Sequence, residues 1–205
     1  LDPRTRCAIW VPDPQPDETI RWSGRCRNGA AQGQGEVLRQ LGDRVIALVA
    51  GQFDGGRLNG PAVVTLANGW RVEADFTAGL APFGVVRRGA DTYQGQLRDT
   101  LPHGRGIWVF ANGARYEGEW ARGERSGRGR LIDQRGEYDG MWANDRRNGT
   151  GIQREGGTSV YRGEWRDDRR NGLGIETYAN GIVIQGSFVN DVPEGRVVYT
   201  APDGQ

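Results

Sequence analysis

The sequence predicts an all-β protein, an elongated single-layer twisted antiparallel sheet of about eight stacked β-hairpin repeats. Gly accounts for 34 of the 205 residues, more than twice the usual share of about 7%. The chain also holds 7 Trp, 6 Tyr and 5 Phe, many of them in strand-like surroundings, which argues against disorder. A pattern of aromatic residues and Gly recurs along the chain, and Asn-Gly turn signals separate its copies, as expected for tight turns between strands.

The repeat is clearest in three copies that read Tyr-x-Gly-x-Trp, at residues 116–120, 138–142 and 161–165. In each copy a Gly follows seven residues after the Trp, and another Gly follows two residues later. The same frame continues upstream at residues 93–97 and downstream at residues 184–188, and it weakens toward the N-terminus. The eight repeats start at residues 22, 49, 72, 93, 116, 138, 161 and 184. A fixed period of this length indicates a repeat array, which we expect over residues 20–205.

Each repeat is predicted to be one hairpin. Period-two alternation places Tyr, Gly and Trp on one face of a strand, with the intervening charged and amide residues on the other. A polar turn such as residues 143–149 leads into a second strand such as residues 106–110. Ala-Asn-Gly, at 111–113 and 179–181, then turns the chain into the next repeat. Because Gly weakens a strand, we expect it where a neighbouring aromatic ring approaches the backbone closely.

The unit Tyr-x-Gly-x-Trp followed by Gly-x-Gly resembles the MORN repeat (membrane occupation and recognition nexus). The resemblance covers residues 20 to about 198 and is strongest over 93–190. It implies the elongated single-layer sheet described above, and it implies roles in scaffolding, dimerisation and peptide binding, with lipid binding proposed for some members. The chain departs from the pattern in its N-terminal third, where Cys26, Val49 and Val72 replace aromatic residues.

Residues 1–19 are predicted to form an N-terminal cap, because the ends of a repeat array need covering. Cys7 and Cys26, the two cysteines of the chain, would pin this cap onto the first hairpin if they form a disulfide. That bond would close a loop of about 20 residues, worth roughly 3 kcal/mol in the chain-entropy model. The alternative is two buried free thiols in a cytosolic protein.

The chain starts at Leu1 rather than Met, which would fit a removed signal peptide. Together with the cysteine pair, this start favours an extracytoplasmic location, for which we expect a bacterial periplasm. A cytoplasmic location is the alternative.

Composition and motifs argue against several classes of function. The net charge is +1, whereas a nucleic-acid binder needs an excess of basic residues on one face. No stretch approaches the 18 apolar residues of a membrane-spanning helix. The single histidine, His103, falls in a predicted turn, and the Gly-x-Gly pairs lie inside hairpins rather than before a helix, unlike a dinucleotide site. We therefore expect a non-enzymatic protein without cofactor or metal.

The aromatic residues are the first candidate for a binding face. The Tyr side chains are predicted to stack in one row and the Trp side chains in a parallel row, which together would line a groove in a curved sheet. Such a groove could dock a partner protein, a peptide or a second copy of the chain. The alternative is that these residues are only the internal spine of the array. The set comprises Tyr93, Leu97, Tyr116, Trp120, Tyr138, Trp142, Tyr161, Trp165 and Phe188.

The arginines of the hairpin turns are the second candidate, as contacts for anionic lipid or another anionic ligand. They are Arg122, Arg125, Arg146, Arg147, Arg169 and Arg170, and we expect them to form a ridge along one edge. Acidic residues such as Asp145 and Asp168 share these turns, so a solubilising edge is the alternative. Glycan or cell-wall binding through the aromatic residues is a further possibility. The sequence identifies neither the partner nor the oligomeric state.

Overall fold

A computed structural model describes residues 1–202, which form strands and turns in two compact units. Unit 1 comprises residues 1–103, and unit 2 begins at Gly104. In the described range 17 strands and no helix are present. Consequently, no helix in this range is long and apolar enough to cross a membrane.

Unit 1 is an open antiparallel sheet in which β3 to β8 pair in chain order. The short strands β1 and β2 both pair with β3, so the first repeat is a broken hairpin. The strands are β1 (Glu18–Trp22), β2 (Arg25–Arg27), β3 (Ala30–Leu41), β4 (Arg44–Asp54), β5 (Arg57–Leu66), β6 (Trp70–Phe76), β7 (Phe83–Arg88) and β8 (Asp91–Arg98).

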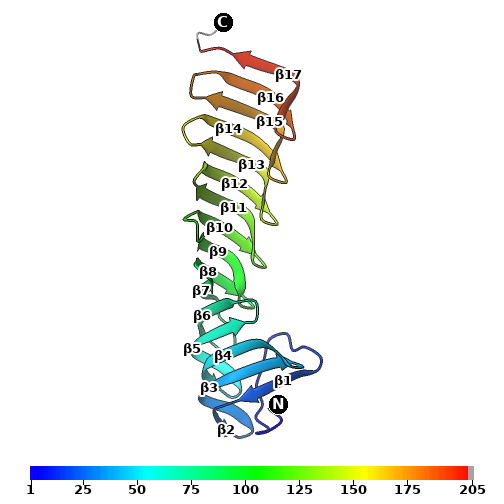
Figure 1. Ribbon diagram of the computed structural model, residues 1–205, viewed down its shortest axis with the longest axis vertical. Helices are drawn as coiled ribbons and strands as arrows, with labels where there is room; N and C mark the ends of the chain where they lie inside the picture. The colour runs from blue at the N-terminus through cyan, green and yellow to red at the C-terminus, as the bar shows by residue number, and fades with distance from the viewer. Residues whose placement is uncertain (203–205) are drawn as a thin grey trace. The chain divides into compact units, whose positions relative to one another are not determined.

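Unit 2 repeats one hairpin after another, each strand pairing antiparallel with the next (Figure 1). Its strands are β9 (Leu101–Val109, whose first three residues belong to unit 1), β10 (Arg115–Ala121), β11 (Glu124–Asp133), β12 (Gly136–Ala143), β13 (Arg146–Glu155), β14 (Ser159–Arg166), β15 (Arg169–Tyr178), β16 (Val183–Val189) and β17 (Val192–Thr200). The predicted all-β architecture of single-layer antiparallel hairpins is confirmed. His103, expected in a turn, lies within β9.

The turns are of two kinds. Within a repeat, two residues with positive φ connect the strands, as at Asn144 (49°) and Asp145 (65°), a geometry that matches the twist of the paired strands. The connection is shorter than the polar segment 143–149 expected from sequence, because β13 already begins at Arg146. Between repeats, the Gly of Ala-Asn-Gly takes the positive φ, 84° at Gly113. The preceding Asn112 instead accepts a hydrogen bond from the N–H of Ala114 through its side chain.

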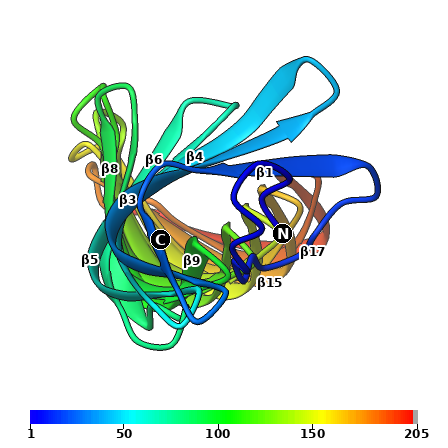
Figure 2. The same ribbon diagram turned by 90° about the horizontal axis from the view of Figure 1, so that it is seen from below.

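The N-terminal segment is tied to the first hairpin. Cys7 and Cys26 form a disulfide, with their Cα atoms 5.8 Å apart, so the predicted pairing is confirmed. Cys7 is fully buried, while Cys26, on β2, is exposed. Asp2 is fully buried and accepts a hydrogen bond from the N–H of Trp22 at 2.7 Å. Figure 2 shows this segment beside β1.

Residues 9–12 lie over the apolar side chains of unit 1. Ile9, Trp10, Val11 and Pro12 surround a space of about 90 Å³ together with side chains of β3 to β6, namely Val37, Val49, Phe53, Leu58, Val64, Leu66 and Phe76. The N–H of Trp10 donates to the carbonyl of Gly56, and the Arg57 guanidinium lies 5.2 Å from the centre of the Trp10 ring. The chain's own N-terminal segment therefore covers this part of the sheet.

Candidate functional site

The aromatic rings of unit 2 form one alternating stack on one face of the sheet, which we call the ring face. The Tyr ring of each regular repeat packs edge-on against the Trp of its own repeat and the aromatic ring at the Trp position of the next, which is Phe188 in the last repeat. Tyr138, for example, lies 5.2 Å from Trp142 and 5.3 Å from Trp165 between ring centres. The sequence predicted separate Tyr and Trp rows. In unit 2 the two sets interleave in the order Trp120, Tyr116, Trp142, Tyr138, Trp165, Tyr161, Phe188.

Each Tyr ring packs against a pair of glycines on adjacent strands. Gly140 pairs with Gly151 across β12 and β13, and a Cβ atom on either would collide with the ring of Tyr138. The Tyr138 hydroxyl extends past this glycine pair and donates to the carbonyl of Met141 at 3.0 Å. The indole N–H of Trp142 likewise donates to the carbonyl of Gly129 at 3.1 Å. The expectation that strand glycines admit an aromatic ring is confirmed.

The nine residues proposed as a partner-binding face are all buried. Their exposed fractions run from 0% at Tyr93 and Tyr116 to 6% at Leu97 and Trp120. Burial raises the pKa of Tyr93 and of Tyr161 to about 12, and it also raises the pKa of Tyr116 and of Tyr138. These side chains form the buried spine of the array.

The MORN-repeat family model matches residues 50–71, 93–115, 116–137, 138–154, 161–183 and 185–205, together more than half of the chain. The chain belongs to the MORN-repeat family. The six matches begin at or within one residue of six expected repeat starts, and the copies at 22 and 72 are not matched. Both unmatched copies lie in the N-terminal third, where the sequence departs most from the pattern.

Among solved structures, the MORN array is similar to the SAS-4 (dCPAP) TCP domain of Drosophila melanogaster, which was solved in complex with a proline-rich motif of Ana2 (dSTIL). The identity is 15%, the match covers 71% of this chain and 80% of that chain, and the TM-score is 0.43. No curated protein matches the chain.

In the irregular repeats of unit 1, the residues beneath the Tyr position differ along with the residue that replaces Tyr. Val49 stands in the Tyr position of its repeat, and the paired positions beneath it are Gly51 and Ala62 rather than two glycines. Val72 likewise stands above Ala74 and Gly84. A Val side chain leaves room for a Cβ atom that a Tyr ring would exclude. The repeats that have Val in place of Tyr therefore also have Ala in place of one glycine of the pair.

Arginines cover the ring face of unit 2 and join neighbouring repeats, in what we call the Arg–Asp clasp. The backbone N–H and Nε of Arg147 both donate to the carboxylate of Asp168 in the next repeat, and its Nη2 donates to the Asp168 carbonyl at 2.7 Å. The Arg147 guanidinium also lies 4.2 Å from the centre of the Trp165 ring. Arg125 with Asp145 and Arg170 with Asp191 repeat the arrangement.

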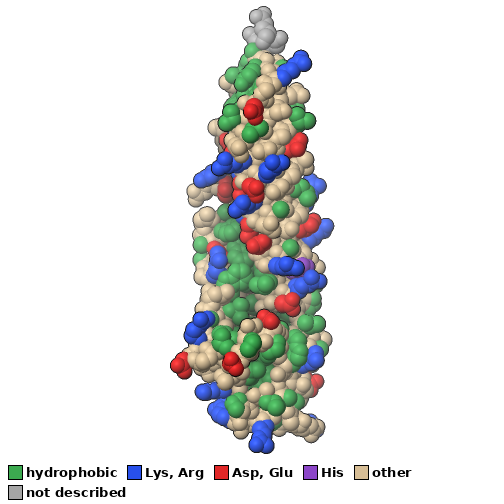
Figure 3. Space-filling model, turned by 90° about the vertical axis from the view of Figure 1, so that its right-hand side faces the viewer, with side chains coloured by type: hydrophobic (Ala, Val, Ile, Leu, Met, Phe, Trp, Pro, Cys, Tyr) green, Lys and Arg blue, Asp and Glu red, His purple; other side chains and the backbone are tan. Residues whose placement is uncertain are grey.

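The six turn arginines therefore do not form one ridge, because they occupy different positions in the hairpins. Arg125, Arg147 and Arg170 point onto the ring face and are engaged by aspartates, while Arg122, Arg146 and Arg169 are exposed. Arg146 forms an ion pair with Asp167 at 3.3 Å. On the side shown in Figure 3, basic and acidic side chains intersperse along the whole face, with hydrophobic side chains among them.

The face opposite the ring face carries the exposed apolar side chains of β11 to β15. An open hollow of about 540 Å³ lies there, lined by Met141, Ile152 and Leu173 and by the charged residues Arg128, Asp139, Arg162 and Glu164. Met141 is 39% exposed and Leu173 is 67% exposed. The sequence pattern did not indicate these residues as a site. The alternation that places Tyr and Trp on the buried face also places Met141 and Leu173 on the opposite face. An outward-facing strand position does not by itself indicate binding.

The opposite face of unit 1 has a wider hollow, of about 1310 Å³. Small residues line it where β3 to β8 pass, and Phe83, which is 60% exposed, stands at its side. Its charged lining includes Glu36 and Asp75, together with Glu73 and Arg71, which form an ion pair at 2.9 Å. Each unit thus presents an open surface on the face away from the buried side chains.

Proposed function

We propose that this MORN array is a non-enzymatic scaffold that binds a partner protein through the face opposite its aromatic rings. The observation that carries the proposal is the hollow of unit 2, where the exposed apolar side chains of Met141 and Leu173 lie among charged residues. Exposed apolar side chains rimmed by polar residues are typical of protein interaction surfaces. A rigid sheet is also a suitable support, because its contacts need little ordering when a partner binds.

The Arg–Asp clasp argues against the anionic-lipid alternative. Three of the six candidate arginines already donate to aspartates of the next repeat, and membrane attraction needs several uncompensated basic residues, at about 1 kcal/mol each. The rings that would stack on a sugar or a peptide are buried. These two facts favour the opposite face as the surface that a partner contacts.

The Cys7–Cys26 disulfide supports placing the protein outside the cytoplasm, since disulfides persist in oxidising compartments. We therefore propose an extracytoplasmic location, with a bacterial periplasm as the specific compartment. The test is the mass of the protein from its native source, alkylated with and without prior reduction. Two alkyl groups added without reduction would contradict this location.

The binding proposal is tested by capturing partners from the source organism with the intact chain and with a Met141→Glu, Leu173→Glu variant. The variant should fold normally, because both side chains are exposed, and it should lose the captured partner. The matched control is Val45→Glu, an exposed position on β4 of unit 1. Equal recovery by the variant and the control, or no specific partner of the intact chain, would contradict the proposal.

A further inference from the structure

The three clasp arginines differ in one hydrogen bond. In addition to the clasp, Nη1 of Arg147 donates to the side-chain oxygen of Gln153 at 3.0 Å. Nη1 of Arg170 lies 2.8 Å from a carboxylate oxygen of Glu176. In both repeats the acceptor stands six residues after the Arg, on the same strand.

In the repeat that contains Arg125, this acceptor is missing. The residue six positions after Arg125 is Leu131, whose side chain cannot accept a hydrogen bond. Within residues 1–202, Nε and Nη2 of Arg125 are bound to Asp145, and Nη1 has no acceptor. The guanidinium is nevertheless held in place, because it lies 4.2 Å from the centre of the Trp142 ring and its side chain is only 19% exposed.

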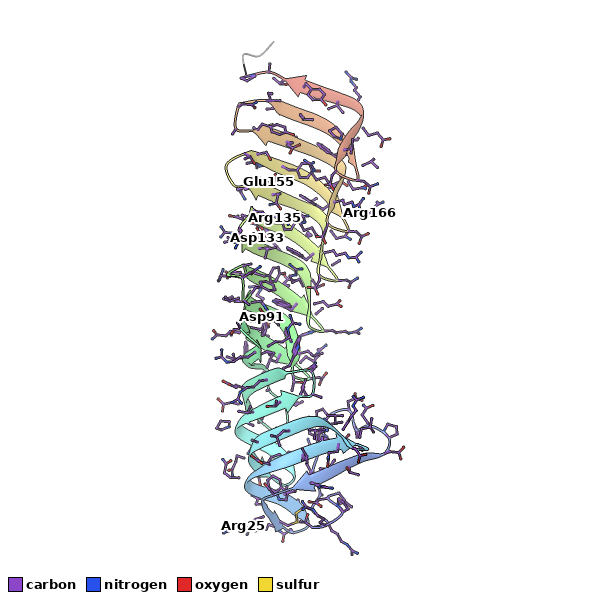
Figure 4. All side chains as sticks on the ribbon, viewed as in Figure 1. Arg25, Asp91, Asp133, Arg135, Glu155 and Arg166 are labelled. Atoms are coloured by element: carbon purple, nitrogen blue, oxygen red, sulfur yellow. A yellow bond between two sulfur atoms is a disulfide. The ribbon has the colours of Figure 1, made fainter. Side chains whose placement is uncertain are left out.

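A hollow of about 200 Å³ lies at this position on the ring face of unit 2. Arg125, Leu131, Tyr138, Gln153 and Arg147 line it, and Asp133 and Arg135 stand at its loop end. Figure 4 labels Asp133, the last residue of β11, and Arg135, in the turn to β12, beside each other. The volume corresponds to roughly six water molecules at liquid density, enough for a carboxylate with a short aliphatic stem.

The charges of the hollow suit one negative group. Its two acids are already engaged, since Asp168 accepts from Arg147 and Asp133 accepts from the backbone N–H groups of Arg135 and Gly136. The Arg135 side chain is exposed and has no ion-pair partner in the described part of the chain. The hollow therefore offers one fixed donor, Nη1 of Arg125, and one exposed cation, Arg135. Leu131 forms its apolar wall.

We infer that this hollow binds a carboxylate group, which takes the place that Gln153 and Glu176 fill in the next two repeats. The carboxylate accepts from Nη1 of Arg125 and pairs with Arg135, and its stem lies against Leu131. A guanidinium fixed by two other bonds binds such a group with little loss of freedom. The inference is independent of the proposed function, because it concerns the ring face and a single chemical group.

The experiment titrates the intact chain with sodium acetate and, separately, with a short peptide that has blocked termini and a single Glu as its one charged residue. Nuclear magnetic resonance follows the Nε–H signals of Arg125 and Trp142, with sodium chloride at equal ionic strength as the reference. We expect saturable shifts with carboxylate and not with chloride. Acetate binding as tight as peptide binding would assign the site to small free carboxylates, and tighter peptide binding would assign it to an acidic side chain.

Two variants test the built-in comparison between repeats. Leu131→Gln gives Arg125 the side-chain acceptor that Gln153 gives Arg147 in the next repeat. This variant should weaken carboxylate binding about tenfold or more while the array stays folded. Gln153→Leu frees Nη1 of Arg147, which lines the same hollow, so it should offer the carboxylate a further donor, tighten binding and make the Trp165 Nε–H signal respond. Linear shifts shared with chloride would mean an adventitious ion only. That result, or undiminished binding by the folded Leu131→Gln variant, would overturn the inference.

Discussion

The guanidinium of Arg147 lies between two repeats, 4.2 Å from the centre of the Trp165 ring, and its Nε and Nη2 both donate to Asp168, as does the Arg147 backbone N–H. The contact repeats at Arg125 over Trp142 and at Arg170 over Phe188. One side chain thus closes the ring stack from solvent and joins consecutive hairpins. In a repeat protein whose stability depends on nearest-neighbour interfaces, this contact holds one unit to the next.

Replacing Arg147 with Ala should destabilise the array by about 1–2 kcal/mol, because it removes charge-assisted hydrogen bonds and a cation–π contact. Arg147→Lys should recover only part of this loss, since an ammonium group lacks the planar fork of donors. Urea denaturation followed by tryptophan fluorescence measures both. The control is Arg146→Ala, whose exposed ion pair should contribute less than about 0.5 kcal/mol. Equal losses at both positions would show that the clasp has no special role.

Gly151→Ala should destabilise the protein by roughly 1–3 kcal/mol, the usual cost of overpacking, because the added Cβ would collide with the ring of Tyr138. In the Tyr138→Val background the same substitution should cost much less, as the natural combination of Val49, Gly51 and Ala62 indicates. Equilibrium unfolding of the double-mutant cycle measures this coupling. Strictly additive effects would contradict the proposed steric cause.

Acid should loosen the N-terminal segment. Burial opposes ionisation of Asp2, but hydrogen bonds from the backbone N–H groups of Trp22, Arg4 and Thr5 hold its pKa below the ordinary 3.8. A hydrogen-bonded ion pair with Arg39 holds the pKa of Glu18 below 4.5. A carboxyl with a lowered folded pKa stabilises the fold above its unfolded pKa and loses that effect as pH falls through the folded value.

We therefore expect the segment to become protease-sensitive below about pH 4, the ordinary range of these carboxyls, and to be protected at pH 6. Digestion by pepsin at low pH and by an acid-tolerant fungal protease across the range measures this change. An Asp2→Asn, Glu18→Gln variant should be sensitive at both pH values. If it shows the same pH dependence as the natural chain, other groups control the transition.

Removing the Cys7–Cys26 disulfide with a Cys7→Ser, Cys26→Ser variant should lower the stability of unit 1 by roughly 3 kcal/mol, the chain-entropy estimate for a loop of this length. Unit 2 should be unaffected, because the bond lies within unit 1. Hydrogen exchange resolved by peptide would report the two units separately. Faster exchange in unit 2 to the same degree would show that the two units unfold together.

The repeat copies and the pairing of strands into hairpins followed from the sequence, because period-two alternation and glycine position are local properties of the chain. The disulfide also followed, since the chain has two cysteines, both near its N-terminus. The candidate site was harder to predict. Alternation assigns Tyr116 and Trp120 to one face, but it does not state whether that face is open or closed.

What the sequence determined by itself is the hairpin array, together with the residues that stand on each face of its strands. Only the tertiary structure decided that the aromatic face is closed, because Arg125 and Arg147 reach from one repeat to an aspartate of the next. It also decided that Leu131 leaves one guanidinium donor without an acceptor. The first feature depends on contacts between side chains 20 or 21 residues apart. The second depends on which guanidinium donor remains open once the aspartate is bound, and the spacing of residues specifies neither geometry.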